Sequence, residues 1–322
     1  MARRATFIKD LEKEGKELLL FEAGNSFFKP KDVPSSQERK KARLIGTAYM
    51  RMGYQAVNVG SDDLLAGIEF LRELEREIHL PLLSANLLDG KRGNPVFRTH
   101  VVLDLGGIRV GVFGLTSDNR QTEGGTSEGY FVSNPIAAAR KVAAELGKDC
   151  DVIVGLSNLG SFKEYTKLVQ QVQGVRFIIG SGGSGTYHQI LRSDRGWEAF
   201  LFQAYPRGQY LGRIDLRVLK GANDFADLSR KVNLERQISS IERQLDSYRR
   251  GTGRATSIPQ DRREEYIKKL EEFKKRSEAR LKELERDSRR QSTLIGTFIS
   301  LDEKLKDDPE MKELVDRFKK GS

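Results

Sequence analysis

The stretch from Leu18 to Asp63 constrains the fold most. It holds two short apolar runs, Leu18–Phe21 and Ala56–Val59, and each run is followed by a glycine and polar residues. These polar tips are Gly24-Asn25 and Gly60-Ser61-Asp62-Asp63. Short apolar runs bounded by glycine predict buried strands of an α/β sheet. Ligands of such sheets lie beyond the carboxyl ends of the strands, so the two tips mark the expected site.

Strand and helix patterns alternate up to Leu219, which predicts an α/β domain. We expect further strands at Pro81–Asn86, Phe97–Leu105, Ile108–Gly114, Asp151–Leu156, Val175–Ile179, Ile190–Leu191, Trp197–Ala204 and Tyr210–Leu219. We expect helices at Ala5–Glu14, Arg39–Met52, Leu64–Ile78, Asn134–Leu146 and Ser161–Val172. The turn Gly106-Gly107 lies between two alternating apolar runs and predicts a β-hairpin.

The pattern changes after residue 225, where a heptad repeat begins. Its apolar residues are spaced 4, 3, 4, 3: Leu234, Ile238, Ile241, Leu245 and Tyr248. Residues Ser257–Gln260 have capping-box spacing and open a second long helix, which predicts an antiparallel coiled-coil hairpin. A strand at Leu294–Leu301 and a helix from Asp308-Pro309 then return to the main domain. We therefore expect a domain at 1–225, a helical hairpin at 226–292 and a returning segment at 293–322.

Composition limits the classes to which the chain can belong. At 322 residues, 38% of them apolar and 32% charged, it can hold one large α/β domain with an appendage. The net charge of +10 is spread along the chain and no nucleic-acid-binding signature is present, so we expect no specific nucleic-acid partner. Cys150 is the only cysteine, which excludes intramolecular disulfides, Cys-based zinc sites and haem-attachment motifs. The sequence shows no bilayer-spanning run and no signal peptide.

Several motifs carry a resemblance to one family. The segments around Asn25 and Asp62 are joined by PLLSAN at Pro81, RVGVFGLT at Arg109, LSNLG at Leu156 and QYLGRIDLRV at Gln209. Together they resemble the calcineurin-like metallophosphoesterases, in particular the 5'-nucleotidase branch, over roughly Ala2 to Leu219. The resemblance implies a metallophosphoesterase-like α/β/β/α sandwich and a two-metal centre at the strand tips. It also implies a first strand with an Asp-x-His pair, so we expect that the chain starts partway through the family's fold.

The metal-ligand positions that the resemblance implies are changed. The family's GD, GNHE, lsHlG and GGHtH motifs place their ligands at Asn25, Ser61, Asp62, Asn158, Gly182 and Ser184. Two-metal hydrolysis needs carboxylates and imidazoles on two ions about 3.5–4 Å apart. Amides, hydroxyls and glycine at most of these positions do not provide that donor set. We therefore predict that the six positions are vestigial, with no catalytic residue, no metal and no cofactor.

Alternatives to this interpretation stay open. Asp62 and Asp63 are weak candidates for a single hard cation, together with Asn25 and Asn158. The interpretation we favour is that Asp62 or Asp63 caps the following helix. More broadly, the alternative to an empty site is one or two divalent cations, Mn, Mg or Ca.

Three histidines could in principle supply imidazole ligands: His79, His100 and His188. His79 ends a predicted helix and His100 lies within a predicted strand. His188 follows the glycine-rich loop Gly180–Gly185. We predict that each is a surface or packing residue.

The leading functional hypothesis is a non-catalytic scaffold or interaction subunit, a pseudoenzyme. The helical hairpin and the helix at Asp307-Asp308-Pro309-Glu310 resemble the front part of bacterial extracytoplasmic proteins that continue into multihaem cytochrome domains. This resemblance implies a periplasmic or extracytoplasmic location, with the cytoplasm as the alternative that stays open. It also implies a role in an electron-transfer assembly and a protein partner for the hairpin. The expected partners are a multihaem cytochrome or a second copy. The alternative hypothesis is a metal-dependent phosphomonoesterase or nucleotidase with an unusual metal site.

Overall fold

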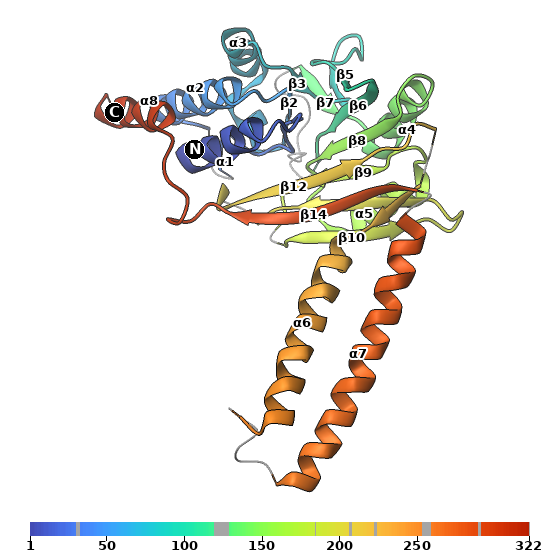
Figure 1. Cartoon of the computed structure of the whole chain (residues 1–322). Coiled ribbons are helices and arrows are strands. Elements are labelled where there is room, and N and C mark those ends of the chain that lie inside the picture. The colour runs from blue at the N-terminus through green and yellow to red at the C-terminus, as the bar shows by residue number, and fades with distance from the viewer. Residues whose placement is uncertain are drawn as a thin grey trace. The chain divides into compact units, whose positions relative to one another are not determined.

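The computed structural model describes residues 1–29, 33–118, 129–183, 185–205, 208–221, 224–252, 259–288 and 291–321, without the side chains of residues 260, 261 and 287. The chain forms two compact units (Figure 1). The first consists of Met1–Gly212 and Phe298–Ser322, and the second of Arg213–Thr297.

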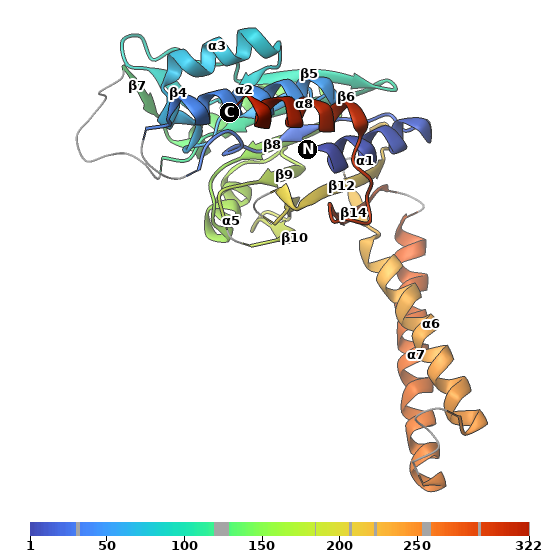
Figure 2. The same ribbon diagram turned by 90° about the vertical axis from the view of Figure 1, so that its left-hand side faces the viewer.

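Two sheets form the centre of the first unit (Figures 1 and 2). The smaller sheet has the parallel order β1 (Phe21–Glu22), β2 (Ala56–Asn58) and β3 (Leu82–Leu83). The larger sheet has the order β10 (Tyr187–Arg192), β11 (Glu198–Gln203), β9 (Phe177–Gly180), β8 (Val152–Ser157), β6 (Ile108–Leu115) and β5 (His100–Leu105). Its inner strands are parallel and the two edge strands are antiparallel to their neighbours. A short antiparallel pair, β4 (Leu87–Asp89) and β7 (Tyr130–Val132), completes the unit.

Helices cover both outer faces of the two sheets. The helices α1 (Ala2–Lys13), α2 (Ser36–Arg51), α3 (Ile68–Ile78) and α8 (Pro309–Lys320) share one apolar core with the smaller sheet. The helices α4 (Pro135–Leu146) and α5 (Phe162–Gln171) share a second core with the larger sheet. Strand β2 of the smaller sheet lies against β6 and β8 of the larger one. The mixed α/β sandwich expected from the sequence is therefore confirmed.

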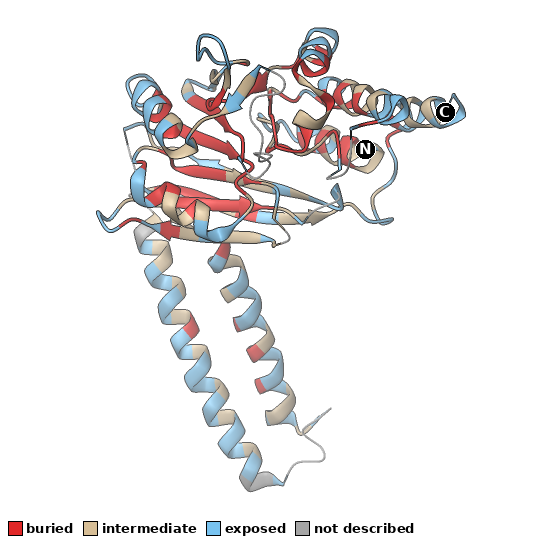
Figure 3. Ribbon diagram, turned by 180° about the vertical axis from the view of Figure 1, so that it is seen from behind, coloured by how far each residue is buried: buried red, intermediate tan, exposed pale blue. Residues whose placement is uncertain are grey.

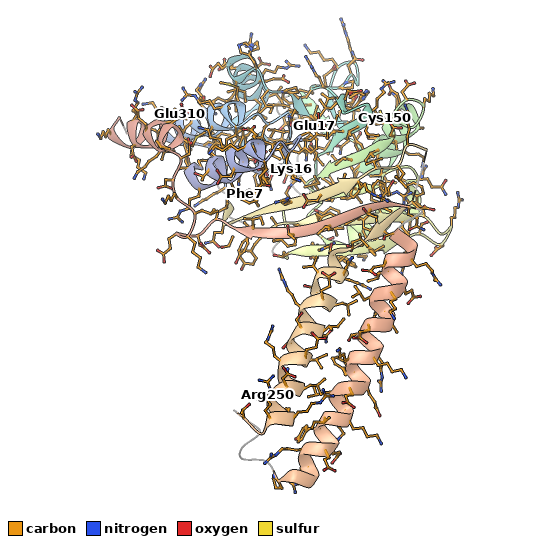
Figure 4. All side chains as sticks on the ribbon, viewed as in Figure 1. Phe7, Lys16, Glu17, Cys150, Arg250 and Glu310 are labelled. Atoms are coloured by element: carbon orange, nitrogen blue, oxygen red, sulfur yellow. The ribbon has the colours of Figure 1, made fainter. Side chains whose placement is uncertain are left out.

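Local side chains fix where the helices begin. Ser35 and Glu38 form a complete capping box at the start of α2, and Asn134 accepts two main-chain N–H groups at the start of α4. Asp308 caps α8 and also accepts a hydrogen bond from Lys9 on α1 at 2.7 Å. Helix α8, on which Figure 4 labels Glu310, thereby joins the N-terminal helix.

Several boundaries differ from the sequence prediction, and two of them lie beside the candidate site. The helix expected to start at Leu64 starts at Ile68, because Gly67 has φ +81° and separates it from a 3₁₀ turn at Asp63–Ala66. The first strand is limited to Phe21–Glu22, although the apolar run begins at Leu18. Ser257, the first residue of the predicted capping box, lies outside the described residues.

The second unit consists of a small sheet and two long helices. Its sheet has the order β12 (Tyr210–Arg217), β14 (Ser292–Ser300) and β13 (Phe225–Asp227). Helices α6 (Ser229–Arg250) and α7 (Gln260–Ser288) pack along one another, and the buried positions of α6 face α7 (Figure 3). Among the described helices, none combines the length and the apolar character needed to cross a bilayer.

Candidate functional site

The tips of β1, β2, β8 and β9 meet at one edge of the sandwich. Asn158, directly after β8 and 2% exposed, joins three of them through its side-chain amide. Its Oδ1 accepts the N–H of Ser61 at 2.8 Å, and its Nδ2 donates to Ser181 Oγ at 3.2 Å. Ser181 Oγ donates in turn to the carbonyl of Ala23 at the end of β1, at 2.8 Å. A chain of side-chain hydrogen bonds thus crosses from one sheet to the other.

Asn25 makes the second link between β1 and β2. Its Oδ1 accepts the main-chain N–H of Asp62 at 2.9 Å, and its backbone is left-handed with φ +59°. Gly60 lies directly against it, because a Cβ at residue 60 would overlap both Oδ1 and the main-chain nitrogen of Asn25. The two tips therefore touch through main-chain atoms.

Asp63 is the fully buried carboxylate at this edge. Its Oδ2 accepts the N–H groups of Asn25 and Gly60, both at 2.9 Å, and its Oδ1 accepts the N–H of Phe27 at 3.1 Å. Burial raises the pKa of Asp63 to about 7, although the three N–H groups oppose this shift. The interpretation that Asp62 or Asp63 caps the next helix is wrong, because neither side chain makes a cap hydrogen bond there. Asp63 instead ties the β1 and β2 tips together.

The raised pKa of Asp63 predicts how stability depends on pH. The folded state keeps this proton up to about pH 7, whereas the unfolded chain loses it near the ordinary value of 3.8. Folding therefore takes up a proton between these values, so the Asp63 contribution to the free energy of unfolding should fall as pH rises from about 4 to about 7. The slope from one proton is at most about 1.4 kcal/mol per pH unit. Urea denaturation across this range should show the fall in the native protein and a smaller fall in Asp63→Asn. Equal slopes in the two proteins would contradict the assignment.

The glycine-rich loop after β9 packs closely against the β8 tip. Gly182 has φ +87°, and a Cβ there would lie 2.7 Å from Asn158 Nδ2. A Cβ on Gly183 would overlap the carbonyl oxygen of Gly160. A histidine at residue 182 would therefore need both a different backbone and a displaced Asn158. Ser184, the other candidate position in this loop, lies outside the described residues.

Sequence reasoning missed a second polar network beneath these tips. Asn58 donates to the carbonyls of Ala23 and Leu115, both at 2.9 Å, although it lies inside a buried strand. Thr116 donates to the carbonyl of Val59 at 2.7 Å and pairs with Asn86 through its main chain. The sequence did offer a sign of this network, because Asn58 is the one polar residue in the run Ala56–Val59. A polar side chain in a buried strand is expected to form hydrogen bonds.

The three histidines occupy other surroundings. His79 ends α3 in the left-handed region with φ +51°, and His100 Nδ1 lies 2.9 Å from Thr99 Oγ1. The ring of His188 lies 4.5 Å from that of Phe202. Across the residues that the structure describes, no group of three or more His, Cys, Asp or Glu side chains is placed to hold a metal ion. The donors that meet at the strand tips are amide and hydroxyl groups together with Asp62 and Asp63.

The sequence of this chain is similar to those of several 5'-nucleotidases. The 5'-nucleotidase of Diplobatis ommata is 27% identical over 242 residues, which cover 69% of this chain and 41% of that protein. The 5'-nucleotidase of Vibrio cholerae is 29% identical over 171 residues, covering 51% of this chain and 30% of that protein. The chain thus spans less than half the length of these relatives. No protein-family model matches it.

Solved structures show the same architecture. The calcineurin-like phosphoesterase YfkN from Bacillus subtilis superposes with a TM-score of 0.61 at 14% identity, covering 100% of this chain and 88% of that one. The 5'-nucleotidase precursor from Thermus thermophilus gives 0.59 at 23% identity, covering 68% and 45%. The chain has the calcineurin-like phosphoesterase fold. Its homologues and its structural neighbours are phosphoesterases of this kind, so the strand tips described above occupy the edge where such sheets carry their sites.

Proposed function

We propose that this chain is a phosphoesterase-fold module that acts through protein contacts rather than by hydrolysing a phosphoester. One observation supports the proposal: side chains at candidate ligand positions already bind the main chain of neighbouring strand tips. Asn25 Oδ1 and Asn158 Oδ1 each accept a main-chain N–H, and both oxygens of Asp63 do so. An ion at these positions would compete with the N–H groups for the same oxygens, and each buried hydrogen bond that it displaced would cost about 1–3 kcal/mol.

The proposal predicts no metal-dependent hydrolysis. Purified protein supplied with Mn²⁺ should leave p-nitrophenyl phosphate and AMP intact, and elemental analysis should find no stoichiometric transition metal. Asn25→Asp should gain no activity, because its neighbour Gly60 and the Asp62 N–H keep residue 25 facing the β2 tip. Mn²⁺-dependent hydrolysis that disappears in Asn158→Ala would contradict the proposal. That loss would also exclude a contaminating phosphatase, because a contaminant does not respond to a change in this chain.

The comparisons favour a second candidate, a metal-dependent phosphomonoesterase or nucleotidase. Its support is that the related proteins from Diplobatis ommata and Vibrio cholerae are 5'-nucleotidases. Under this candidate, one or two divalent cations (Mn, Mg or Ca) bind near Asn25, Asp62 and Asn158. Asn25→Asp should then raise Mn²⁺-dependent cleavage, because a carboxylate bridges two cations better than a neutral amide does. The same assay therefore separates the two candidates by opposite results for one variant.

We further propose an extracytoplasmic location, with a multihaem cytochrome as the partner within an electron-transfer assembly. Support comes from the resemblance of the hairpin and the Asp307–Glu310 segment, and from relatives that include a snake venom 5'-nucleotidase. Fractionation of the source cells, followed by absorbance of co-purified haem, tests both parts. Recovery of the chain in the cytoplasmic fraction would contradict the location.

A further inference from the structure

Helices α6 and α7 are joined by ion pairs along one side of their seam. Lys231 pairs with Glu285 at 2.8 Å, Glu242 with Lys274 at 2.8 Å, and Arg249 with Glu271 at 2.6 Å. Heptads counted from the buried residues of α6 (Ile238, Ile241 and Leu245) place Glu242 and Arg249 on the same flank of that helix. Residues further along α6 pair with residues earlier in α7, so the two helices run antiparallel.

The other flank of the helix pair has a different character. On α6 it consists of uncharged polar residues spaced 4, 3, 4, 3: Asn233, Gln237, Ser240, Gln244 and Ser247. On α7 the corresponding heptad position holds Tyr266 and Phe273, whose exposed fractions are 48% and 45%, followed by Arg280. We call these eight residues the polar-aromatic flank. Tyr266 also stacks on Tyr248 of α6, with ring centroids 5.9 Å apart. Aromatic side chains are enriched in protein interfaces.

The seam between the two helices is weak by itself. Lys231, Lys274 and Ser277 occupy seam positions that are apolar in a stable coiled coil, and Ser277 is 6% exposed. Apolar seam residues of α7 such as Leu270 and Leu281 are only partly buried. Because a pair of helices buries one seam only, further packing partners would stabilise it.

We propose that two copies of this chain associate through the polar-aromatic flank and form an antiparallel four-helix bundle. The flank of α6 carries no charge from Asn233 to Ser247, so two copies can face each other there without like-charge contacts. Amide and hydroxyl groups both donate and accept hydrogen bonds, which makes this stripe complementary to itself.

The positions of the residues agree with a twofold axis that crosses the helices near their middle. The ion pairs Lys231–Glu285 and Glu242–Lys274 set the register of the two helices and place Phe273 level with Arg243 and Gln244. With the axis there, Phe273 meets its own symmetry mate and Gln244 lies beside its own. Arg280 then lies opposite Tyr266 of the second copy, a cation–π arrangement, and Ser240 lies opposite Ser247.

The available area is sufficient for a specific dimer. Helix α6 has 22 residues and is therefore about 33 Å long, and two helices side by side are about 20 Å wide. This gives roughly 650 Å² per copy and about 1,300 Å² in total, within the range of specific interfaces. An unrelated partner with an apolar helix would fit the aromatic residues but would not use the match between Arg280 and Tyr266. The inference does not depend on whether the strand tips hydrolyse phosphoesters.

Disulfide trapping tests the proposal on the full chain. In a Cys150→Ser background, Gln244→Cys should form a covalent dimer on mild oxidation. Arg243→Cys, at the same level but on the outer side of the helix, should stay monomeric. Equal cross-linking at the two positions, or none at Gln244→Cys, would overturn the proposed interface.

Sedimentation velocity gives an independent measurement of the same interface. The native chain should sediment as a dimer, and Phe273→Asp should sediment as a monomer because two carboxylates would meet at the axis. Lys275→Asp, two residues further on and on the outer side, should remain a dimer. Circular dichroism shows whether each variant stays helical. A native chain that is monomeric at every concentration tested would overturn the proposal, and so would a helical Phe273→Asp variant that remains a dimer.

Discussion

Asp63→Asn should lower the free energy of unfolding by about 3 kcal/mol at neutral pH. The carboxylate of Asp63 accepts three N–H groups from the β1 and β2 tips, and it is fully buried. An asparagine presents an NH₂ group to at least one of those donors, so both the donor and the new NH₂ lose their partners. Urea denaturation followed by tryptophan fluorescence, through the single Trp197, measures the change.

Asp62→Asn is the matched control for this prediction. It is the same chemical change one residue earlier, and it leaves all three hydrogen bonds of Asp63 in place. It also removes a neighbouring negative charge that raises the pKa of Asp63. We therefore expect less than half the loss that Asp63→Asn causes. Equal losses for the two variants would show that charge at this edge matters, rather than the three N–H contacts.

The sequence was sufficient where the fold depends on local pattern. The apolar run at Ala56–Val59 predicted β2, and the Gly106-Gly107 turn predicted the β5–β6 hairpin; both are confirmed. The helix pattern likewise predicted the helix that ends at Ile78, on which Leu71 and Leu74 are buried. These elements follow from side-chain periodicity, which is a property of neighbouring residues.

The sequence was insufficient where the fold depends on contacts between distant segments. Asp63 precedes a helix and therefore suggested a cap, yet its hydrogen-bond partners include Asn25 and Phe27 on another strand tip. The start of α3 was misplaced for a related reason, because Gly67 adopts a left-handed backbone that spacing does not reveal. Asn58 was missed because an amide in a buried run is explained only by carbonyls contributed from β1 and β6.

The candidate site shows the same division. The family motifs predicted that Asn25, Asp62 and Asn158 would lie at one edge, and the structure links Asn25 to Asp62 and Asn158 to Ser61. The motifs did not predict what these side chains do there. The side-chain oxygens of Asn25 and Asn158 each accept a main-chain N–H from the β2 tip. These bonds form only because the loops lie close together. The distance between the loops depends on how the two sheets pack, and no single motif determines it.

Gly60→Ala should destabilise the protein by about 3 kcal/mol. The added methyl group would overlap the Oδ1 and the main-chain nitrogen of Asn25, and a main-chain atom cannot move aside as a flexible side chain can. The β1 and β2 tips would have to separate, which would also lengthen the hydrogen bonds that Asp63 accepts from Asn25 and Gly60. Thermal and urea denaturation of the variant measure the combined loss.

Gly212→Ala is the matched control, because the nearest atom to a Cβ there is a ring carbon of Phe298 at an ordinary 3.7 Å. We expect it to be neutral or stabilising by up to about 1 kcal/mol, since glycine is unfavourable within a strand. If Gly60→Ala proved as mild as Gly212→Ala, the tips of β1 and β2 would have to lie further apart in solution. A cation could then fit between Asn25 and Asp62, and the phosphoesterase candidate would gain support at the expense of the scaffold. A large loss confined to Gly60→Ala would instead mean that main-chain contact holds this edge together.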